Sequence, residues 1–264
     1  MILKKVFKYF GILLIMMSSF YYTDKIALIV QKNNPIMKQI NESKKEKNIK
    51  SVNAIIDNDK IIPGKNGLEI NENKSFGIMK SFGAYDSYYL VYDQKKPNIS
   101  IDNYKDKIIK SGNTIDRNVS FVLEYNDSLI SFFAKNKIKA SILIDKENIK
   151  KVNYMELINN DFNKYNDVEL QLNKYSKNKN ICYLNDRTYY DFCKKRNKYL
   201  VSTDYVFSND NVFEIKNNIK NGTIIYVKNN TSIDNLKVLL NQIKFKGLNI
   251  VYLSELISEE NKDL

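Results

Sequence analysis

The sequence predicts an α/β protein built on a parallel sheet. Residues 119–123 and 140–144 are two short apolar runs, rich in β-branched residues, with the length of buried strands. Between them, residues 128–133 carry apolar side chains at the spacing of a helix that packs on a sheet. A strand, a helix and a second strand in this order form a βαβ unit, whose two strands lie parallel.

The composition describes a folded and basic protein. The 264 residues suffice for one sizeable domain and a smaller one, and 43% hydrophobic residues support a packed core. A net charge of +12 would suit an anionic partner such as nucleic acid, lipid head groups or an acidic wall polymer. The lysines alternate with Asp and Glu, however, and Lys, Asn, Ile and Tyr are common throughout, as an AT-rich genome would produce. We therefore expect no nucleic-acid partner.

The chain contains no His and two Cys. The absence of His excludes His metal ligands and Ser-His-Asp triads. Cys182 and Cys193 are too few for a zinc site made only of Cys. Their spacing suits the end of a strand and the helix after it, so a disulfide is possible in an oxidising compartment. The alternative, which we favour, is two buried thiols.

Residues 1–24 form a signal-anchor or transmembrane segment. Lys4, Lys5 and Lys8 precede an uncharged run of 14 residues, 9–22. That run has the length of a secretory h-region, but no position offers a small-residue cleavage pattern. We expect an uncleaved anchor that starts near residue 6, with the body on the extracytoplasmic side, and a secreted protein if the leader is cleaved.

Two regions separate the anchor from the predicted sheet. Residues 25–50 look like a stalk or a surface helix. Residues 51–116 form a small mixed α/β region, in which Pro63-Gly64 and Asn66-Gly67 are turn signals. Within it, residues 87–92 and 98–101 are predicted strands. We assign no chemistry to this region.

The βαβ unit resembles the opening of the polysaccharide deacetylase domain (NodB-like, carbohydrate esterase family 4). There an apolar strand ends in T-F-D-D-G and the next strand reads A-T-F-F-V; the corresponding pieces here are V-L-E-Y-N (122–126) and A-S-I-L-I (140–144). The family's closing G-x-I-I-L-L-H-D, helix and K-G-Y-x-F-V-T-L-S-E-L is similar to residues 222–229 and 246–256. This resemblance implies an irregular parallel β/α barrel over residues 117–260.

The part between these two matches is less well specified. We expect a helix at 154–165, a strand at 180–183 and a helix at 186–195. The family carries H-E-I-G-N-H-T-x-x-H in this part, and its last two His bind the metal. When D-V-E-L-Q-L-N-K-Y-S-K (167–177) is aligned with it through Glu169, Asn173 and Lys177 replace those two His.

The resemblance implies a metal-dependent hydrolase site in which every role is altered. In the family, an Asp is the base, a second Asp and two His hold the metal, and a His is the acid; Glu124, Tyr125 and Lys228 stand at the base, ligand and acid positions. A lysine would have to lose a proton, from a reference pKa of about 10.4, at a cost of roughly 4 to 5 kcal/mol at pH 7. We therefore predict no bound metal and no cofactor. The degenerate site positions are Glu124, Tyr125, Asn126, Asp127, Asn173, Lys177 and Lys228.

A second hypothesis concerns the signs of the charges at these positions. Lys177 and Lys228 would enter a pocket that holds Glu124 and Asp127, so that internal ion pairs replace the metal. The alternative is that both lysines are exposed to solvent, which is the usual place for Lys.

Three functions follow from the sequence. The first is a catalytically inactive deacetylase-like protein outside the membrane that binds a cell-wall glycan or a protein partner, with Tyr125 as a stacking face. The second is an active carbohydrate or peptidoglycan N-deacetylase with atypical ligands, namely Glu124, Asp127 and Asn173, whose amide oxygen suits calcium. The third, nucleic-acid binding, rests on charge alone and conflicts with the anchor.

Overall fold

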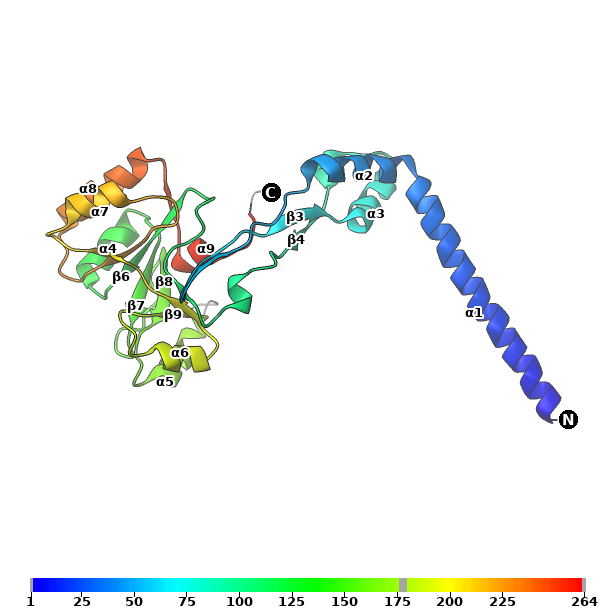
Figure 1. Cartoon of the computed structure of the whole chain (residues 1–264), viewed down its shortest axis with the longest axis horizontal. Helices are drawn as coiled ribbons and strands as arrows, with labels where there is room; N and C mark the ends of the chain where they lie inside the picture. Colours follow the sequence, from blue (N-terminus) through cyan, green and yellow to red (C-terminus); the bar gives the residue numbers. More distant parts are fainter. Residues whose placement is uncertain (1, 176–179, 263–264) are drawn as a thin grey trace. The chain divides into compact units, whose positions relative to one another are not determined.

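The structure is a computed structural model that describes residues 2–175 and 180–262 (Figure 1). Its contacts divide the chain into two compact units. The smaller unit contains residues 1–50 and 67–95, and the larger unit contains residues 51–66 and 96–264. The chain passes from one unit to the other three times. The predicted small region at 51–116 is therefore shared between the two units, because its first and last parts join the sheet structure of the larger one.

The smaller unit consists of helices and one two-stranded sheet. Its long first helix contains an apolar stretch, Phe10–Asn33, that is long enough by length and composition to cross a membrane. This helix continues past residue 24, so the first part of the predicted stalk belongs to the same helix. The elements are α1 (Ile2–Asn33), α2 (Pro35–Lys47), β3 (Gly67–Ile70), α3 (Glu72–Phe82), the 3-10 turn η1 (Ser87–Tyr89) and β4 (Tyr92–Lys95), with β3 and β4 antiparallel.

A small core of its own holds this unit together. Ile36, Met37 and Ile40 form the buried face of α2 and pack with Phe76 and Met79 of α3. Asn34 caps α2, with its side chain accepting the N–H of Ile36 at 2.9 Å, and Pro35 occupies the first helical position, where a missing N–H costs nothing.

The larger unit contains two sheets. The first is parallel throughout, in the order β11-β12-β6-β7-β8, and β13 pairs with β6. The second has the order β1-β2-β5-β10-β9 and is parallel apart from the β1–β2 pair. The strands of the first sheet are β6 (Asn118–Leu123), β7 (Ala140–Ile144), β8 (Met155–Asn159), β11 (Tyr205–Phe207), β12 (Ile224–Val227) and β13 (Asn249–Ile250). Those of the second are β1 (Ile55–Asp57), β2 (Lys60–Ile62), β5 (Ile108–Ile109), β9 (Ile181–Tyr183) and β10 (Tyr199–Val201).

Successive side chains of β6 point to opposite faces of the first sheet. Phe121 and Leu123 join the core formed with the helices on one face, whereas Val122 joins the core shared with the second sheet. Figure 1 shows α4, α7 and α8 gathered on one side of this sheet. The helices of the larger unit are α4 (Asp127–Lys135), α5 (Tyr165–Leu172), α6 (Tyr190–Lys195), α7 (Val212–Asn218), α8 (Ile233–Phe245) and α9 (Leu253–Ile257), with a 3-10 turn η2 (Ile101–Asn103).

These elements confirm the α/β class, the parallel sheet and the βαβ unit, which is β6, α4 and β7. The two sheets face each other across the second core, but over residues 2–175 and 180–262 no ladder of hydrogen bonds joins β8 to β9. Closure into a barrel therefore stays a prediction.

Three predicted elements are wrong. Residues 154–165, expected to be a helix, form β8 and the loop after it, because the buried side of Met155–Asn159 is continuous and pairs with β7. Residues 87–92 are mostly η1, where Asp86 accepts the N–H of Tyr88, and residues 98–101 lead into η2.

Candidate functional site

The loops at the carboxyl ends of β6 and β12 bring one part of the predicted site together. Glu124 follows β6, and its Oε2 accepts the backbone N–H of Asn229 at 2.9 Å, just after β12. Lys228 precedes Asn229 but is exposed, and it forms no ion pair with any described residue. The predicted ion pair of Lys228 is therefore wrong. Lys177 lies outside the described residues, so its predicted ion pair stays a prediction.

Asn126 has a structural role at this edge. Its Oδ1 accepts the backbone N–H groups of Ser128 and Leu129 at 2.9 and 3.1 Å, and so caps α4. Its Nδ2 donates to the carbonyl of Asn229 at 3.0 Å. Asn126 and Glu124 therefore bind the same short loop, which fixes the β12–α8 connection against the end of β6.

A lysine that the sequence analysis missed supplies the positive charge near β6. Lys150, from the loop after β7, lies 2.7 Å from Asp127 Oδ1, and the Tyr125 hydroxyl donates to the same oxygen at 3.0 Å. The ammonium also lies 5.6 Å from the centre of the Tyr125 ring. The hydrogen bond from Lys150, helped by that from Tyr125, lowers the pKa of Asp127 below its usual value. Nothing in the sequence distinguishes Lys150 from the other loop lysines.

The strand β8 corrects the alignment of the middle motif. Read from this strand, E-L-I-N-N-D-F-N-K (156–164) follows the pattern E-I-G-N-H-T-x-x-H, with Glu156 and Asn159 at the Glu and Asn positions. Asn160 and Lys164 then replace the two His. Asn173, by contrast, is an exposed residue in the turn after α5, so its predicted place in the site is wrong. The first alignment depended on Glu169, which belongs to the helix α5 and not to the strand.

Glu156 supports this register. It is buried within the larger unit and accepts the Ser141 hydroxyl at 2.7 Å and the backbone N–H of Ser254 at 3.2 Å. Burial raises the pKa of Glu156 above its usual value, although the serine hydrogen bonds oppose this shift. Ser254 belongs to the closing L-S-E-L segment, so the middle motif and the closing motif are bound to each other in the fold.

A cavity of about 450 Å³ opens where β7, β8 and β9 end. Both realigned positions, Asn160 and Lys164, line it. Side chains that follow three neighbouring strand ends build its wall, as is usual for ligand sites of parallel α/β folds. The lining residues are Asp145 and Glu147 after β7, Asn160, Asp161, Phe162, Asn163 and Lys164 after β8, and Asn185, Asp186 and Tyr189 after β9.

Aromatic rings form one side of this cavity. The rings of Phe162 and Tyr189 stack with their centres 3.8 Å apart and their planes within 6°. Behind them lie Tyr165 and Phe192, and the guanidinium of Arg196 covers the Phe192 ring at 3.6 Å. Tyr189 is the most exposed of these aromatic residues, with 38% of its surface exposed. The packing behind it fixes the position of this ring.

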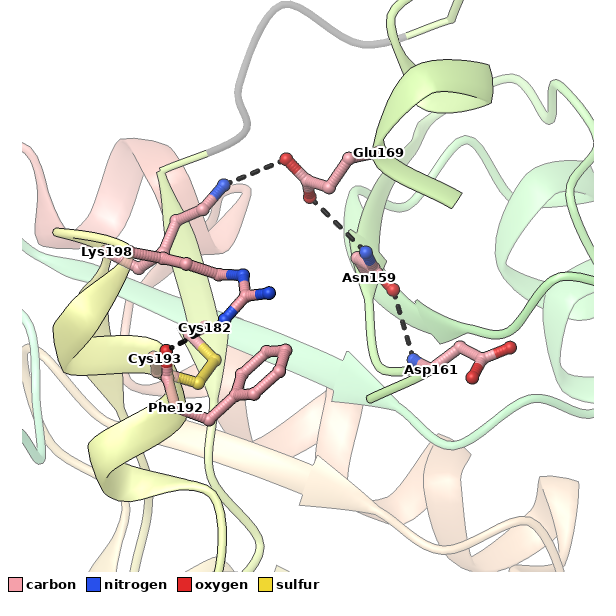
Figure 2. Close-up of a disulfide and its surroundings, with 8 residues drawn as sticks. Asn159, Asp161, Glu169, Cys182, Phe192, Cys193 and Lys198 are labelled. Atoms are coloured by element: carbon pink, nitrogen blue, oxygen red, sulfur yellow. Dashed lines mark hydrogen bonds and ion pairs between the residues drawn. A yellow bond between two sulfur atoms is a disulfide. The ribbon is translucent and has the colours of Figure 1, made fainter. Parts of the chain in front are cut away.

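A disulfide ties the aromatic side of the cavity to the sheet (Figure 2). Cys182 of β9 is bonded to Cys193 of α6, and their Cα atoms lie 6.0 Å apart. The expectation of two buried thiols is therefore wrong, because β9 and α6 place the two side chains against each other. The bond closes the loop that carries Asp186 and Tyr189.

Glu169, on which the first alignment depended, has a structural role. Its carboxylate accepts Lys198 Nζ at 2.9 Å and Asn159 Nδ2 at 3.4 Å (Figure 2). Asn159 Oδ1 in turn accepts the backbone N–H of Asp161 at 3.1 Å. This chain of contacts holds the end of β8, and with it the loop that carries Asn160, Phe162 and the rest of the cavity wall.

The residues at the family's metal positions do not fit its metal. Tyr125 uses its hydroxyl as a donor to Asp127, and the ammonium of Lys164 has no lone pair to offer. Asn160 offers a single neutral amide oxygen. Across the described parts of the chain, no group of three or more His, Cys, Asp or Glu is arranged to hold a metal ion. The chemistry of these donors therefore differs from the two His and one Asp of the family.

Comparison with known proteins gives the fold. No family model matches the sequence. The uncharacterized protein YlxY of Bacillus subtilis is 29% identical over 129 residues, which are 46% of this chain and 40% of that protein, so the match spans less than half of this relative. A crystal structure of BA3943 from Bacillus anthracis, described as a CE4 family pseudoenzyme, superposes with a TM-score of 0.57 at 16% identity and covers 87% of this chain and 97% of that one.

A BA3943 mutant described as having restored enzymatic activity gives a TM-score of 0.56 at 15% identity, over 86% of this chain and 99% of that one. At these identities the comparisons establish a common fold. The resemblance to the polysaccharide deacetylases of carbohydrate esterase family 4 is thus confirmed in the fold of the chain.

Proposed function

We propose that this chain, which has the fold of the CE4 polysaccharide deacetylases, is a deacetylase-like protein without deacetylase activity that binds a cell-wall glycan or a protein partner. The observation that carries this proposal is the donor set at the realigned site: Tyr125, Asn160 and Lys164 stand where the family has an Asp and two His. An ammonium at a ligand position opposes a divalent ion by charge as well as by its missing lone pair.

The replaced acid position supports the same proposal. Lys228 stands where the family has its His acid, and its side chain is exposed at the end of β12. A general acid must lie within hydrogen-bond reach of the leaving group, and the ammonium of Lys228 differs in shape and donor geometry from the imidazole that the family uses. The relative BA3943 is itself described as a pseudoenzyme.

Glycan binding is favoured by the cavity. It combines an exposed Tyr189 ring with several carboxylate and amide oxygens. A flat ring suits the C–H face of a sugar, and oxygen acceptors suit its hydroxyl groups. A protein partner remains the second kind of ligand for the same concave edge.

The outer face of a membrane is the location that we propose. The apolar stretch Phe10–Asn33 is a candidate span, and the lysines at 4, 5 and 8 precede it. The Cys182–Cys193 disulfide supports an oxidising compartment, since cytosolic thiols are normally kept reduced.

The test is to measure acetate release and glycan binding on the same full-length protein. With zinc, cobalt, manganese or calcium present, we expect no acetate from acetylated chito-oligosaccharide or peptidoglycan, and we expect co-sedimentation with peptidoglycan. The control is a variant that restores the family residues, E124D/Y125D/N160H/K164H/K228H. Metal-dependent acetate release by the unmodified protein would refute the proposal; failure to sediment with peptidoglycan would leave only the protein partner.

One observation favours the alternative of an active N-deacetylase. Glu124 keeps a carboxylate at the base position, and the N–H of Asn229 orients it. An atypical metal at this edge would then have to use donors other than Tyr125 and Lys164. Acetate release that is lost in E124Q but kept in D127N would identify this activity and its base.

A further inference from the structure

The cavity at the ends of β7, β8 and β9 is unusual for its charge. It is lined by four carboxylates, those of Asp145, Glu147, Asp161 and Asp186, and by one ammonium, that of Lys164. The whole chain, in contrast, carries a net charge of +12. Among the described residues none of these four carboxylates takes part in an ion pair, whereas carboxylates elsewhere, such as those of Asp127 and Glu255, are paired with lysines.

Two of the carboxylates are held in their ionised form. The backbone N–H of Lys164, with that of Lys146, lowers the pKa of Asp161. Hydrogen bonds from Thr188 lower the pKa of Asp186. Both groups therefore keep their negative charge well below neutral pH, and neither forms an ion pair with a residue that the structure describes.

An unsatisfied acceptor adds to this pattern. Asn160 lines the cavity, and its Oδ1 is buried without a hydrogen-bond donor among the described residues. A buried carbonyl oxygen without a donor costs free energy unless a ligand supplies an N–H or O–H. A ligand complementary to this cavity therefore carries hydrogen-bond donors and a positive charge rather than hydrogen-bond acceptors.

The stacked rings of Tyr189 and Phe162 on one side of the cavity restrict the class of ligand further. Tyr189 presents an exposed ring that Phe162 supports from behind, and the Cys182–Cys193 disulfide holds the loop that carries it. A ligand that suits this site has an apolar ring face, several hydroxyl donors and a cationic group. A free metal ion or a simple amine lacks the first two features.

We infer that the cavity binds amino sugars of a de-N-acetylated glycan, with the sugar ring on Tyr189 and its ammonium among the four carboxylates. This inference rests on the proposed glycan binding and gives it a specificity. Acetylation of the sugar nitrogen removes the charge and two of its three N–H donors. The protein therefore prefers the deacetylated polymer to the acetylated one.

The net charge of the whole protein does not account for the binding of an amino sugar. A cationic oligosaccharide is repelled by a protein with a net charge of +12, so any preference for it must arise from a local site. The same argument makes the acetylated oligosaccharide, which is neutral, the favoured ligand if the cavity plays no part. A binding site in the cavity thus predicts tighter binding of the deacetylated oligosaccharide, and net charge alone predicts tighter binding of the acetylated one.

The test is calorimetric titration of the full-length protein in detergent with the glucosamine tetramer and, separately, the N-acetylglucosamine tetramer. We expect the glucosamine tetramer to bind at least about tenfold more tightly, as expected for charge-assisted hydrogen bonds. Equal or tighter binding of the acetylated tetramer would overturn the inference and leave the proposed glycan binding intact. Binding of neither tetramer would overturn both.

Matched variants locate the site. Glu147 and Asp186 are exposed, so E147Q/D186N removes two charges at little risk to folding. We expect this variant to lose about tenfold or more in affinity for the glucosamine tetramer and to keep its affinity for the acetylated one. D234N is the control, because Asp234 is an exposed carboxylate of α8 that is paired with Lys237. An equal effect of D234N and E147Q/D186N would contradict a local site.

Discussion

The carboxylates at the two ends of the candidate site differ in how they are paired. At the end of β6, Asp127 is paired with Lys150, and Glu124 is bound by the N–H of Asn229. At the ends of β7, β8 and β9, the carboxylates around the cavity form no ion pair with any described residue. Charges at the first end are paired within the chain, and those at the second end are open to a ligand. A site in which residues of the family motifs are replaced can therefore still contain a closed half, at the end of β6, and an open half, at the ends of β7, β8 and β9.

Removal of the disulfide should have the largest effect, and it tests the open half. The bond between Cys182 and Cys193 spans 11 positions in the sequence, and a loop of this size stabilises the folded chain by about 3 kcal/mol. We expect C182A/C193A to lower the free energy of unfolding in urea by about this amount and to weaken glucosamine binding. Reduction of the unmodified protein is the control. An unfolding midpoint that neither change moves would show that this side of the cavity does not depend on the bond.

The buried carboxyl of Glu156 should give the next largest effect, through pH. Burial raises its pKa in the folded state above the usual 4.5, so the unfolded chain releases this proton first as pH rises. Its contribution to stability is therefore present below about pH 4.5 and is lost as pH rises through the folded pKa, by at most about 1.4 kcal/mol per pH unit.

The variant E156Q keeps an oxygen for Ser141 and Ser254 but cannot ionise. We expect urea unfolding at a series of pH values to show a smaller loss of stability above pH 4.5 in this variant than in the unmodified protein. An identical pH dependence of the two proteins would mean that Glu156 titrates normally.

Substitution of Lys150 sharpens the contrast at the closed half. In K150M, the carboxyl of Asp127 loses the donor that contributes most to its low pKa, so we expect that pKa to rise towards its ordinary value. Carboxyl ¹³C chemical shifts followed by NMR would measure it. Since both side chains are largely exposed, the melting temperature should change little. An unchanged pKa of Asp127 would argue against the Lys150 contact.

The smallest effect is expected for Lys228. Its ammonium is exposed and has no ion pair with any residue that the structure describes, so K228A should leave the melting temperature unchanged. Differential scanning calorimetry would show this. A clear loss of stability would revive an internal ion pair of Lys228 and contradict the exposed position of its side chain.

The sequence predicted the parts of the fold where local signals and tertiary structure agree. The strands β6 and β7 are buried on both faces, and α4 between them follows the predicted helical spacing of apolar residues. The helix α8, which the closing family motif implies between residues 229 and 246, is also present, and Ser232 caps it.

The site was predicted at one end only. Glu124 to Asp127 and Lys228 follow strands that are obvious in the sequence, so their positions were fixed with the strands. The strand β8 contains a buried Glu156 and Asn159, residue types that are depleted in strands. The sequence pattern therefore predicts a helix there and aligns the middle motif with α5. The pairing with Lys150 is a loop contact, which no periodicity encodes.

The most direct measurement of this account compares zinc binding by two variants of the full-length protein. The first, Y125D/N160H/K164H, places the family's ligands at the ends of β6 and β8; the second, Y125D/N173H/K177H, places them where the first alignment did. Elemental analysis after incubation with zinc should find about one ion in the first variant and none in the second. Zinc in the second variant and none in the first would show that the site does not lie at the end of β8.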